Sequence, residues 1–361
     1  MSDFDVIVIG GGPAGCYAAL TAAIKGCRVA IFEEHGAIGQ PRHDPGWLME
    51  SQFTKSVISA VGKTVPWSRV KEYRVCNSES GDLIEKSTLG GYLVRRDLLE
   101  KEIAALAIQA GAILYLKTKV MKLIRKEGKV EGVETNSDII PRANGEIFIC
   151  ADGIRSSSNG FAVKEGLCER GDVRPGISYL LANADVSAGI IEHFLSSDPL
   201  LNYRCFWTHH KSACYFSLPV STALHELRER RDNVVSRKIK NAYPVEVSGY
   251  ARASSGKYGE YFKNIVRDNI IFVGDASGGA GNIHGMIQGH FAGTVAATAI
   301  KENDLSEERL FEYQDLVLNT LGKAPFSWYS AREDFGSFND WFREFEESTK
   351  GIKATEFAYF S

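Results

Sequence analysis

Three glycines near the start of the chain are spaced for binding a dinucleotide. Gly10, Gly12 and Gly15 form the pattern G-x-G-x-x-G, with Pro13 and Ala14 between the last two. Gly10 permits a tight turn, Gly12 lets a pyrophosphate approach the backbone, and Gly15 lets a helix pack closely on a strand. Amide groups at the start of such a helix bind phosphate. The spacing therefore predicts a dinucleotide site.

An acidic pair follows this motif at a distance that suits ribose binding. Glu33, with Glu34 next to it, stands 18 residues after Gly15, and its carboxylate can accept hydrogen bonds from an adenosine ribose. The chain around the glycines reads as an apolar strand (5–9), a helix and a second apolar strand (28–32). Strand, helix, spacing and acid together predict a βαβ nucleotide-binding unit. A merely structural glycine-rich turn is the alternative.

A second group of residues favours FAD over NAD as the nucleotide. Gly274 and Asp275 follow an apolar run at 269–273, and Gly285 and Met286 begin a helix rich in small residues. Such an aspartate can bond a ribitol hydroxyl, and the start of the helix can stabilise negative charge on a flavin. The alternative is a strand capped by a turn aspartate before a core helix. Because the dinucleotide motif is also present, we expect FAD.

These motifs, together with Asp152 in the run C-A-D-G-I-R-S at 150–156, resemble the flavoprotein superfamily of aromatic hydroxylases and geranylgeranyl reductases. The hydroxylases usually have G-D-A-A-H and a proline soon after. This chain has G-D-A-S-G and no proline before Gly285, which is similar to the reductases. The run G-Q-P-R-H-D at 39–44 is similar to their G-x-P-x-x-C segment beside the isoalloxazine, with Asp44 in place of the cysteine. The closer resemblance is therefore to the geranylgeranyl reductase family.

The resemblance implies two further cofactor contacts. Arg96 and Glu100 match the R and D positions of the family's R-x-x-F-D-x-x-L helix. In the family, this arginine contacts the cofactor phosphates or the flavin side. Arg96 is therefore preferred to Arg95, although a solvent-exposed arginine at a helix start is the alternative. Val120 stands where family members hold the adenine through backbone groups.

The distribution of charge and cysteine argues for a cytoplasmic protein without nucleic-acid partners. The net charge is −3 and no basic stripe occurs, which argues against nucleic acid. No run of about 18 apolar residues is present, so no membrane-spanning segment is expected, and the N-terminus lacks the basic start of a secretory signal. The seven cysteines are scattered and form no C-x-x-C pair. Such usage is typical of a reducing compartment and argues against zinc or an iron–sulfur cluster.

Histidines give no reason to expect a metal. His209 and His210 are neighbours in a predicted strand, where adjacent side chains point to opposite faces. No carboxylate stands at ligand spacing from them or from His225. We therefore predict no metal site.

The order of strand and helix patterns predicts a discontinuous α/β fold. A helix is expected at 97–110, and broad antiparallel strands are expected from 177 to 219. A charged helix is expected at 222–241. The predicted units are a Rossmann-like FAD-binding domain (1–75, 95–160 and 262–310), an antiparallel-sheet substrate domain (76–94 and 161–261) and a C-terminal helical segment (311–361).

Aromatic residues in two neighbouring predicted strands could line a substrate pocket. They are Tyr203, Phe206, Trp207, Tyr215 and Phe216. A sheet facing a flavin could present such side chains to a polyprenyl chain or an aromatic group. Ordinary core packing is the alternative, because aromatic residues are common in strands.

The predicted chemistry is reduction or desaturation of carbon–carbon bonds in a hydrophobic substrate, such as an isoprenoid or acyl compound. Reduced flavin delivers hydride, so the protein must supply a proton on the other side. Candidate donors are His43, Asp44 and His284; burial beside an apolar ligand would raise the pKa of Asp44 and suit it to this role. Turn formation in the run D-P-G is the alternative role of Asp44.

Two other functions and two kinds of electron donor are compatible with the sequence. A flavin-dependent monooxygenase of the aromatic hydroxylase type is the first alternative function, and a non-catalytic flavoprotein redox partner is the second. No second G-x-G-x-x-G motif is present. NAD(P)H would therefore have to bind transiently, or a carrier such as ferredoxin, a quinone or another protein would supply the electrons.

The C-terminal region carries an aromatic stripe at helical spacing. Its members are Phe335, Phe338, Trp341, Phe342 and Phe345. Such a helix could cover a substrate entrance, form a dimer face, or rest peripherally on a membrane. Its polar face is mainly acidic, which disfavours anionic lipid. Packing onto the rest of the protein is the alternative.

Overall fold

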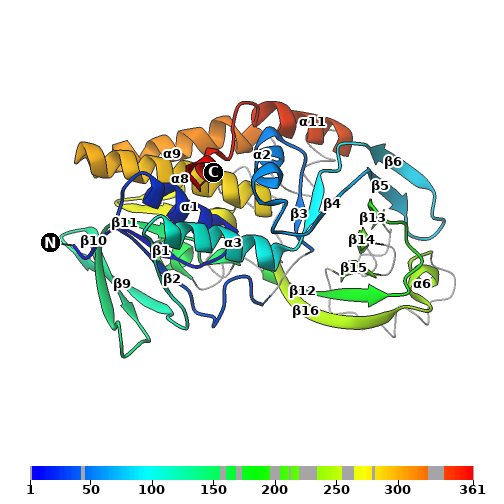
Figure 1. Ribbon diagram of the computed structural model, residues 1–361, viewed down its shortest axis with the longest axis horizontal. Coiled ribbons are helices and arrows are strands. Elements are labelled where there is room, and N and C mark those ends of the chain that lie inside the picture. The colour runs from blue at the N-terminus through cyan, green and yellow to red at the C-terminus, as the bar shows by residue number, and fades with distance from the viewer. Residues whose placement is uncertain are drawn as a thin grey trace.

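An eight-stranded sheet forms the centre of the nucleotide-binding part of the molecule (Figure 1). The computed structural model describes residues 2–41, 45–154, 160–167, 173–195, 204–210, 213–218, 234–253, 264–278, 281–323 and 337–360. The strand order is β17 (Val266–Arg267), β18 (Ile270–Phe272), β11 (Arg142–Cys150), β1 (Phe4–Ile9), β2 (Val29–Phe32) and β8 (Ile113–Tyr115). Strands β18 to β8 pair in parallel. The side chains of β1 from Val6 to Ile9 are buried, as expected for a strand covered on both faces.

An antiparallel extension continues from β11. Strand β10 (Lys129–Thr135) pairs with the start of β11, and β9 (Val120–Lys126) pairs with β10. Strand β11 therefore belongs to both arrangements, since its end pairs in parallel with β1.

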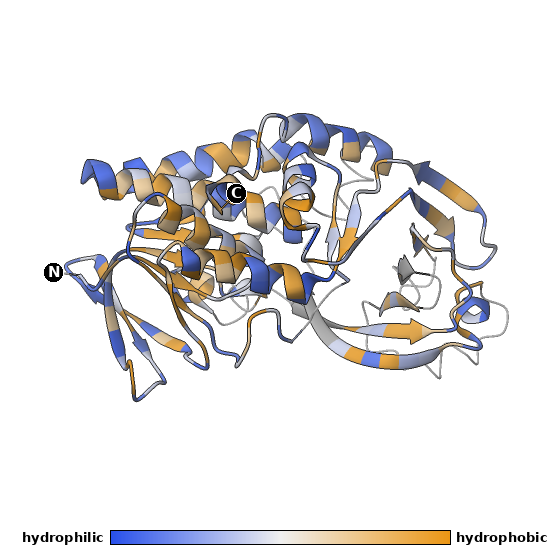
Figure 2. Ribbon diagram, viewed as in Figure 1, coloured by the Kyte–Doolittle hydropathy of each residue, from blue (hydrophilic) through white to orange (hydrophobic). Residues whose placement is uncertain are grey.

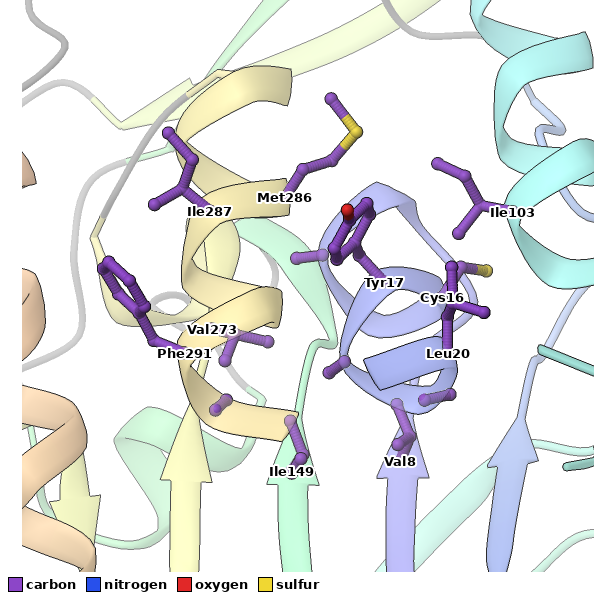
Figure 3. Close-up of a cluster of buried hydrophobic side chains, with 14 of the residues drawn as sticks. Val8, Cys16, Tyr17, Leu20, Ile103, Ile149, Val273, Met286, Ile287 and Phe291 are labelled. Atoms are coloured by element: carbon purple, nitrogen blue, oxygen red, sulfur yellow. The ribbon is translucent and has the colours of Figure 1, made fainter. Parts of the chain in front are cut away.

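Three helices lie side by side on this sheet, with α1 (Pro13–Ile24) between α3 (Arg96–Gln109) and α8 (Asn282–Glu302) (Figure 3). Helix α9 (Glu307–Asn319) packs on α8. Glycines at every fourth position of α8 allow close contact with α1. A Cβ on Gly289 would lie 2.4 Å from the carbonyl oxygen of Ala14, and one on Gly293 would lie 2.5 Å from that of Ala18.

A seven-stranded sheet forms the other large part of the molecule. Its order is β16 (Tyr243–Ala253), β12 (Val173–Ala182), β15 (Ala213–Leu218), β14 (Arg204–His210), β13 (Ile190–Leu195), β5 (Glu72–Asn77) and β6 (Leu83–Ser87). All pairs are antiparallel except β13 with β5. The sheet therefore joins strands from before and after the chain that forms β8 to β11.

The two faces of this sheet have different partners. Phe206 and Phe216 stack with ring centroids 4.5 Å apart and belong to a separate core cluster that includes Val235 and Ile239 of α6 (Val234–Ile239). Trp207 and Tyr215 alternate with them and belong to the main core. The aromatic group predicted for a pocket is thus divided between two faces, and its remaining member, Tyr203, lies outside the described residues.

A small sheet and the C-terminal helices connect the two parts. The sheet has the strand order β3 (Trp47–Leu48), β7 (Tyr92–Val94) and β4 (Trp67–Arg69). Helix α2 (Gln52–Val61) follows β3 in the chain. The remaining elements are α4 (Phe161–Lys164), η3 (Gly274–Ser277), η4 (Leu321–Lys323), α11 (Phe338–Ser348) and η5 (Thr355–Phe360).

The aromatic stripe of α11 is buried. Phe338, Trp341, Phe342 and Phe345 are almost completely inaccessible to solvent, so packing onto the rest of the protein, and not an exposed lipid or dimer face, accounts for these four residues. The fifth predicted member, Phe335, lies outside the described residues.

The element boundaries follow the sequence expectations in most places. The helix expected at 97–110 is α3, and the strands expected from 177 to 219 are β12 to β15. Of the charged helix expected at 222–241, the described part is α6. Strand β16 was not predicted.

Candidate functional site

The glycine motif forms a tight turn between β1 and α1. Gly10 has a φ of +105°, and a Cβ there would lie 2.3 Å from the carbonyl oxygen of Ala151. A Cβ on Gly15 would lie 2.0 Å from the carbonyl oxygen of Gly10. Around Gly12, in contrast, a Cβ would meet nothing within 4 Å. Gly10 and Gly15 are therefore required by packing, whereas Gly12 borders open space.

The first turn of α1 presents backbone amides toward that space. Gly12 is the N-cap and Pro13 follows it, so the N-cap residue has no side chain that could accept a hydrogen bond from the helix start. The first amides of a helix lack partners within the helix and attract anions. The residues therefore fit a pyrophosphate approaching Gly12, as a dinucleotide would require.

Glu33 is held at the end of β2 by backbone groups. Its carboxylate accepts hydrogen bonds from the amide of Gly11, at 2.7 Å, and from that of His35, at 2.8 Å. The His35 ring lies 2.6 Å from the same carboxylate. A carboxylate can accept about four hydrogen bonds, so capacity for a ribose hydroxyl remains.

The chain before β9 lies beside Glu33. The amide of Thr118 donates to the Glu33 carbonyl oxygen at 2.8 Å, and Lys119 forms a 2.6 Å ion pair with Glu34. Val120, the first residue of β9, is therefore brought to the same corner of the site. The structure thus unites three predicted residues, Glu33, Glu34 and Val120, that are far apart in sequence.

The second motif meets the first at Ala14. A Cβ on Gly274 would lie 3.0 Å from the Cβ of Ala14, and one on Gly285 would lie 3.3 Å from it. Asp275 follows Gly274 in the η3 turn. The helix starts of α1 and α8 therefore lie next to each other, as two contact regions of one extended cofactor require.

Gln288 fixes the η3 turn onto α8 and was missed by sequence reasoning. Its side-chain oxygen accepts hydrogen bonds from the amide of Gly274, at 2.5 Å, and from the hydroxyl of Ser277, at 3.0 Å. The residue is completely buried. In the sequence, Gln288 is an amide side chain among the apolar and small residues of this helix, and this polar residue could have indicated a buried hydrogen-bonding role.

Arg96 begins α3 and is paired with Glu100 one turn later. Both side chains are largely buried, whereas Arg95 is more exposed and pairs with Asp97 at 2.9 Å. Glu100 lies close to α1: burial, reinforced by the charges of Glu100 and Glu33, raises the pKa of the Cys16 thiol well above its ordinary value. Arg96 is thus held against the nucleotide-binding helices.

Asp152 lies just after β11, beside the glycine turn. The amide of Ala151 donates to the carbonyl oxygen of Ile9 at 2.8 Å, and the carboxylate of Asp152 accepts from the amide of Phe161 at 3.1 Å. This places Asp152 at the carboxyl edge of the parallel sheet, where open α/β sheets bind ligands.

The candidate proton donors are only partly visible. His43 and Asp44 lie outside the described residues. His284 is completely buried in the first turn of α8, with its ring centroid 4.9 Å from that of Phe345. The side chain of Met286 is buried with Tyr17 between α8 and α1 (Figure 3), so any cofactor contact of Met286 would come from its backbone.

Two features of the described residues bear on other functions. Within these residues, no group of three or more His, Cys, Asp or Glu side chains is arranged to hold a metal ion. No helix in the described part of the chain is long and apolar enough to cross a membrane.

Comparison with known proteins agrees with this geometry. The family model of FAD dependent oxidoreductases matches residues 5–154. The chain is 26% identical to the digeranylgeranylglycerophospholipid reductase of Thermoplasma acidophilum, over 94% of this chain and 89% of that protein.

The chain is an FAD-dependent oxidoreductase.

Solved structures show the same fold for this oxidoreductase. A geranylgeranyl bacteriochlorophyll reductase-like protein from Thermoplasma acidophilum superposes with a TM-score of 0.71 and 21% identity, covering 99% of this chain and 90% of that one. An aklavinone-11 hydroxylase in complex with FAD superposes with a TM-score of 0.61 and 15% identity, covering 83% and 63% of the two chains. The Rossmann-like FAD-binding fold with a second sheet is thus shared, and the resemblance to geranylgeranyl reductases is confirmed.

Proposed function

We propose that this oxidoreductase reduces carbon–carbon double bonds of an isoprenoid lipid. The observation that carries the proposal is the similarity to a digeranylgeranylglycerophospholipid reductase over nearly the whole length of both chains. The geometry supports it, because the predicted flavin contacts converge at Ala14 and a sheet with apolar and aromatic side chains packs into the same core.

The residues that would hold FAD divide along its length. We assign Val120 to the adenine, Glu33 with Glu34 to the ribose, and the open backbone at Gly12 to the pyrophosphate. Asp275 would bond the ribitol, with the start of α8 at Gly285 near the flavin. Further contacts are assigned to Pro13, Ala14, Gly10, Gly15, Arg96, Asp152, Gly274 and the backbone of Met286.

When bound and reduced by the electron donor, FAD would supply a hydride equivalent to one substrate carbon. The protein must then hold the substrate, exclude water and deliver a proton to the second carbon. On the seven-stranded sheet, the face with Trp207 and Tyr215 belongs to the main core and is the face that we assign to the isoprenoid chain. His43 and Asp44 stay our candidates for the proton donor. His284 is a weaker candidate, because its ring is completely buried against Phe345.

The electron donor and the cellular site are part of the same proposal. We propose NAD(P)H, bound transiently, or a carrier protein such as ferredoxin as the donor. A cytoplasmic enzyme that contacts a membrane peripherally would meet such a lipid where it resides.

A flavin-dependent monooxygenase is the second candidate function. It is favoured by the shared fold of the aklavinone-11 hydroxylase, and it differs from a reductase in needing oxygen. A non-catalytic redox partner would bind FAD without turnover of either kind.

Oxygen dependence separates these functions. We would mix the purified flavoprotein with an isoprenoid lipid and either NADPH, NADH or dithionite, with and without oxygen. A reductase forms saturated product in the absence of oxygen. It does so at least when dithionite reduces the flavin, even if neither NADPH nor NADH is its electron donor. Oxygen consumption that requires both NAD(P)H and substrate, with oxygenated product, would instead identify a monooxygenase.

A further inference from the structure

Gln288 is a polar side chain in a largely apolar part of the molecule. Helix α8 rests on the central sheet, whose strands are mostly hydrophobic (Figure 2), and Gln288 is completely buried there. Its neighbours in the helix, Ile287 and Gly289, are also buried. Burial of an amide side chain is unfavourable unless the amide forms hydrogen bonds. The hydrogen bonds of Gln288 therefore indicate why this position holds an amide.

These hydrogen bonds connect α8 to the η3 turn that carries Asp275. The side-chain oxygen of Gln288 accepts from the Gly274 amide at 2.5 Å and lies 3.0 Å from the Ser277 hydroxyl. A backbone N–H can only donate, so the Gly274 contact fixes which end of the Gln288 carboxamide faces the turn. The Nε2 atom of Gln288 has no acceptor among the described residues. Gln288 therefore serves the turn as an acceptor.

The two residues that Gln288 holds stand on either side of Asp275. Gly274 directly precedes Asp275, and Ser277 follows it by two positions. Without the Gln288 acceptor, the buried amide of Gly274 would lack a partner, which is unfavourable until the backbone turns toward another acceptor or water. Such a movement of the turn would displace Asp275 relative to α8. FAD binding would then have to restore the original position.

We propose that Gln288 is a positioning residue for the flavin, because it holds Asp275 and the start of α8 at the spacing that favours reduced FAD. The inference rests on the proposed function, in which Asp275 bonds the ribitol and the start of α8 lies near the flavin. A flavin that takes up two electrons and one proton carries a negative charge. The positive end of a helix stabilises such a charge only close to its first turn. Displacement of Asp275 relative to α8 therefore weakens the binding of reduced FAD more than that of oxidised FAD.

A purely structural role for Gln288 predicts a different result. It would lower the free energy of unfolding of the apoprotein and change the affinities for oxidised and reduced FAD by the same factor. A positioning role changes the ratio of the two affinities. The reduction potential of the bound flavin reports this ratio directly, since a tenfold change corresponds to about 30 mV for a two-electron couple.

FAD titration and potentiometry of the full-length Gln288→Met protein test the proposal. Methionine keeps the approximate volume of the side chain and removes the acceptor. We expect oxidised FAD to bind about tenfold more weakly, a loss typical of a buried donor left without a partner. Reduced FAD should lose about a further tenfold, which lowers the reduction potential by about 30 mV. Ser277→Ala leaves the Gly274 contact in place and should cause smaller changes of the same sign.

Two further variants serve as controls. Thr298→Val lies about 15 Å further along α8, at 1.5 Å per residue, and removes only a 2.9 Å bond to the carbonyl oxygen of Thr294. Its FAD affinities and potential should match those of the wild type. Gln288→Glu returns an oxygen acceptor to the turn, and burial favours the protonated carboxyl group. This variant should therefore recover most of the FAD affinity that Gln288→Met loses.

A wild-type potential in a Gln288→Met protein that binds FAD would overturn the proposal in favour of a structural role. Equal affinity losses in Gln288→Met and Gln288→Glu would overturn it as well. If Gln288→Met does not fold, Ser277→Ala takes its place, and a wild-type potential in that variant would contradict the proposal. A wild-type protein that reduces no lipid, while the variants show the expected potentials, would refute the proposed function alone.

Discussion

Gly289 of α8 lies directly against Ala14 of α1, and a Cβ on Gly289 would stand 2.4 Å from the Ala14 carbonyl oxygen. The obstacle is backbone, which cannot turn aside as a flexible side chain could. This contact fixes the separation of the two helices whose starts carry the predicted flavin contacts. The geometry of the cofactor site therefore depends on Gly289, which lies in the contact between α8 and α1.

Gly289→Ala should destabilise the protein, although alanine is the better helix former by about 1 kcal/mol. Overpacking typically costs about 1–3 kcal/mol, and here the new methyl group would meet backbone. We expect a lower free energy of unfolding in urea and weaker FAD retention. Lys301→Ala, on the exposed end of the same helix, should change stability by less than about 0.5 kcal/mol. An unchanged or increased stability of Gly289→Ala would contradict the described packing.

Gly12→Ala and Gly15→Ala should fail in different ways. A Cβ at residue 12 has open space around it, and the N-cap φ of −75° suits alanine, so the apoprotein should fold at a cost of about 1 kcal/mol or less. FAD affinity should fall at least tenfold, or about 1.4 kcal/mol, because the methyl group would occupy the approach of the pyrophosphate. Gly15→Ala should impair folding itself, since its Cβ would lie 2.0 Å from the Gly10 carbonyl oxygen.

Circular dichroism and FAD titration distinguish the two effects. Undiminished FAD affinity in a folded Gly12→Ala protein would show that the pyrophosphate binds elsewhere.

Phe342→Ala should be strongly destabilising. Its ring lies 6.0 Å from that of Trp47 and 5.3 Å from that of Tyr73, measured between centroids, and so joins the small sheet to the seven-stranded one. Truncation of a buried phenylalanine costs about 3–5 kcal/mol. Urea unfolding should show this loss, while Glu347→Ala on the exposed face of α11 should remain near wild type. A small effect of Phe342→Ala on the free energy of unfolding would mean that α11 does not pack on both the small sheet and the seven-stranded sheet in solution.

Glu356 anchors the C-terminal segment, and its substitution should give a pH-dependent effect. Its carboxylate accepts hydrogen bonds from the hydroxyls of Tyr17, at 2.8 Å, and Thr21, at 3.0 Å, and contacts His290. Burial by itself would raise the pKa of Glu356, but the hydrogen bond and charge of His290, with Tyr17, hold it below its ordinary value of 4.5.

The sign of the effect follows from the lowered pKa. The ionised carboxylate stabilises the folded state fully above the ordinary pKa, and this contribution is lost as the pH falls through the folded pKa. Glu356→Gln should therefore lower the free energy of unfolding by about 2 kcal/mol at neutral pH. The difference from wild type should shrink below about pH 4.5. A difference that grows on acidification would refute the assignment.

Local patterns in the sequence predicted the nucleotide-binding half well. The strand from Asp5, the glycines and Glu33 follow one another within a single βαβ unit, so spacing alone determines their arrangement. Ala14 and Gly274 are distant in the chain, but each sits in a motif whose position in the fold is known. The FAD cofactor and the α/β fold class could therefore be inferred from the sequence alone.

Other features depend on tertiary pairing that no local pattern encodes. Tyr73 of β5 pairs with Ile191 of β13 in a parallel register, and nothing near either residue specifies that partner. Strand β16 was missed although Tyr243, Val245 and Val247 alternate with other residues along it, because Pro244 within the run argues against a strand assignment. Gln288 and Glu356 act as buried hydrogen-bond acceptors, a role that becomes evident only when α1, α8 and the C-terminus are brought together. The domain boundaries and the roles of the site residues stay predictions.

Single-turnover reduction of a lipid tests the central claim most directly. The flavoprotein would be reduced with dithionite, freed of excess reductant and mixed with digeranylgeranylglycerophospholipid in the absence of oxygen. We predict that the oxidised flavin spectrum returns and that the lipid gains the mass of one hydrogen molecule for each double bond reduced. A flavin that stays reduced until oxygen is admitted, or a product that has gained oxygen, would contradict the account.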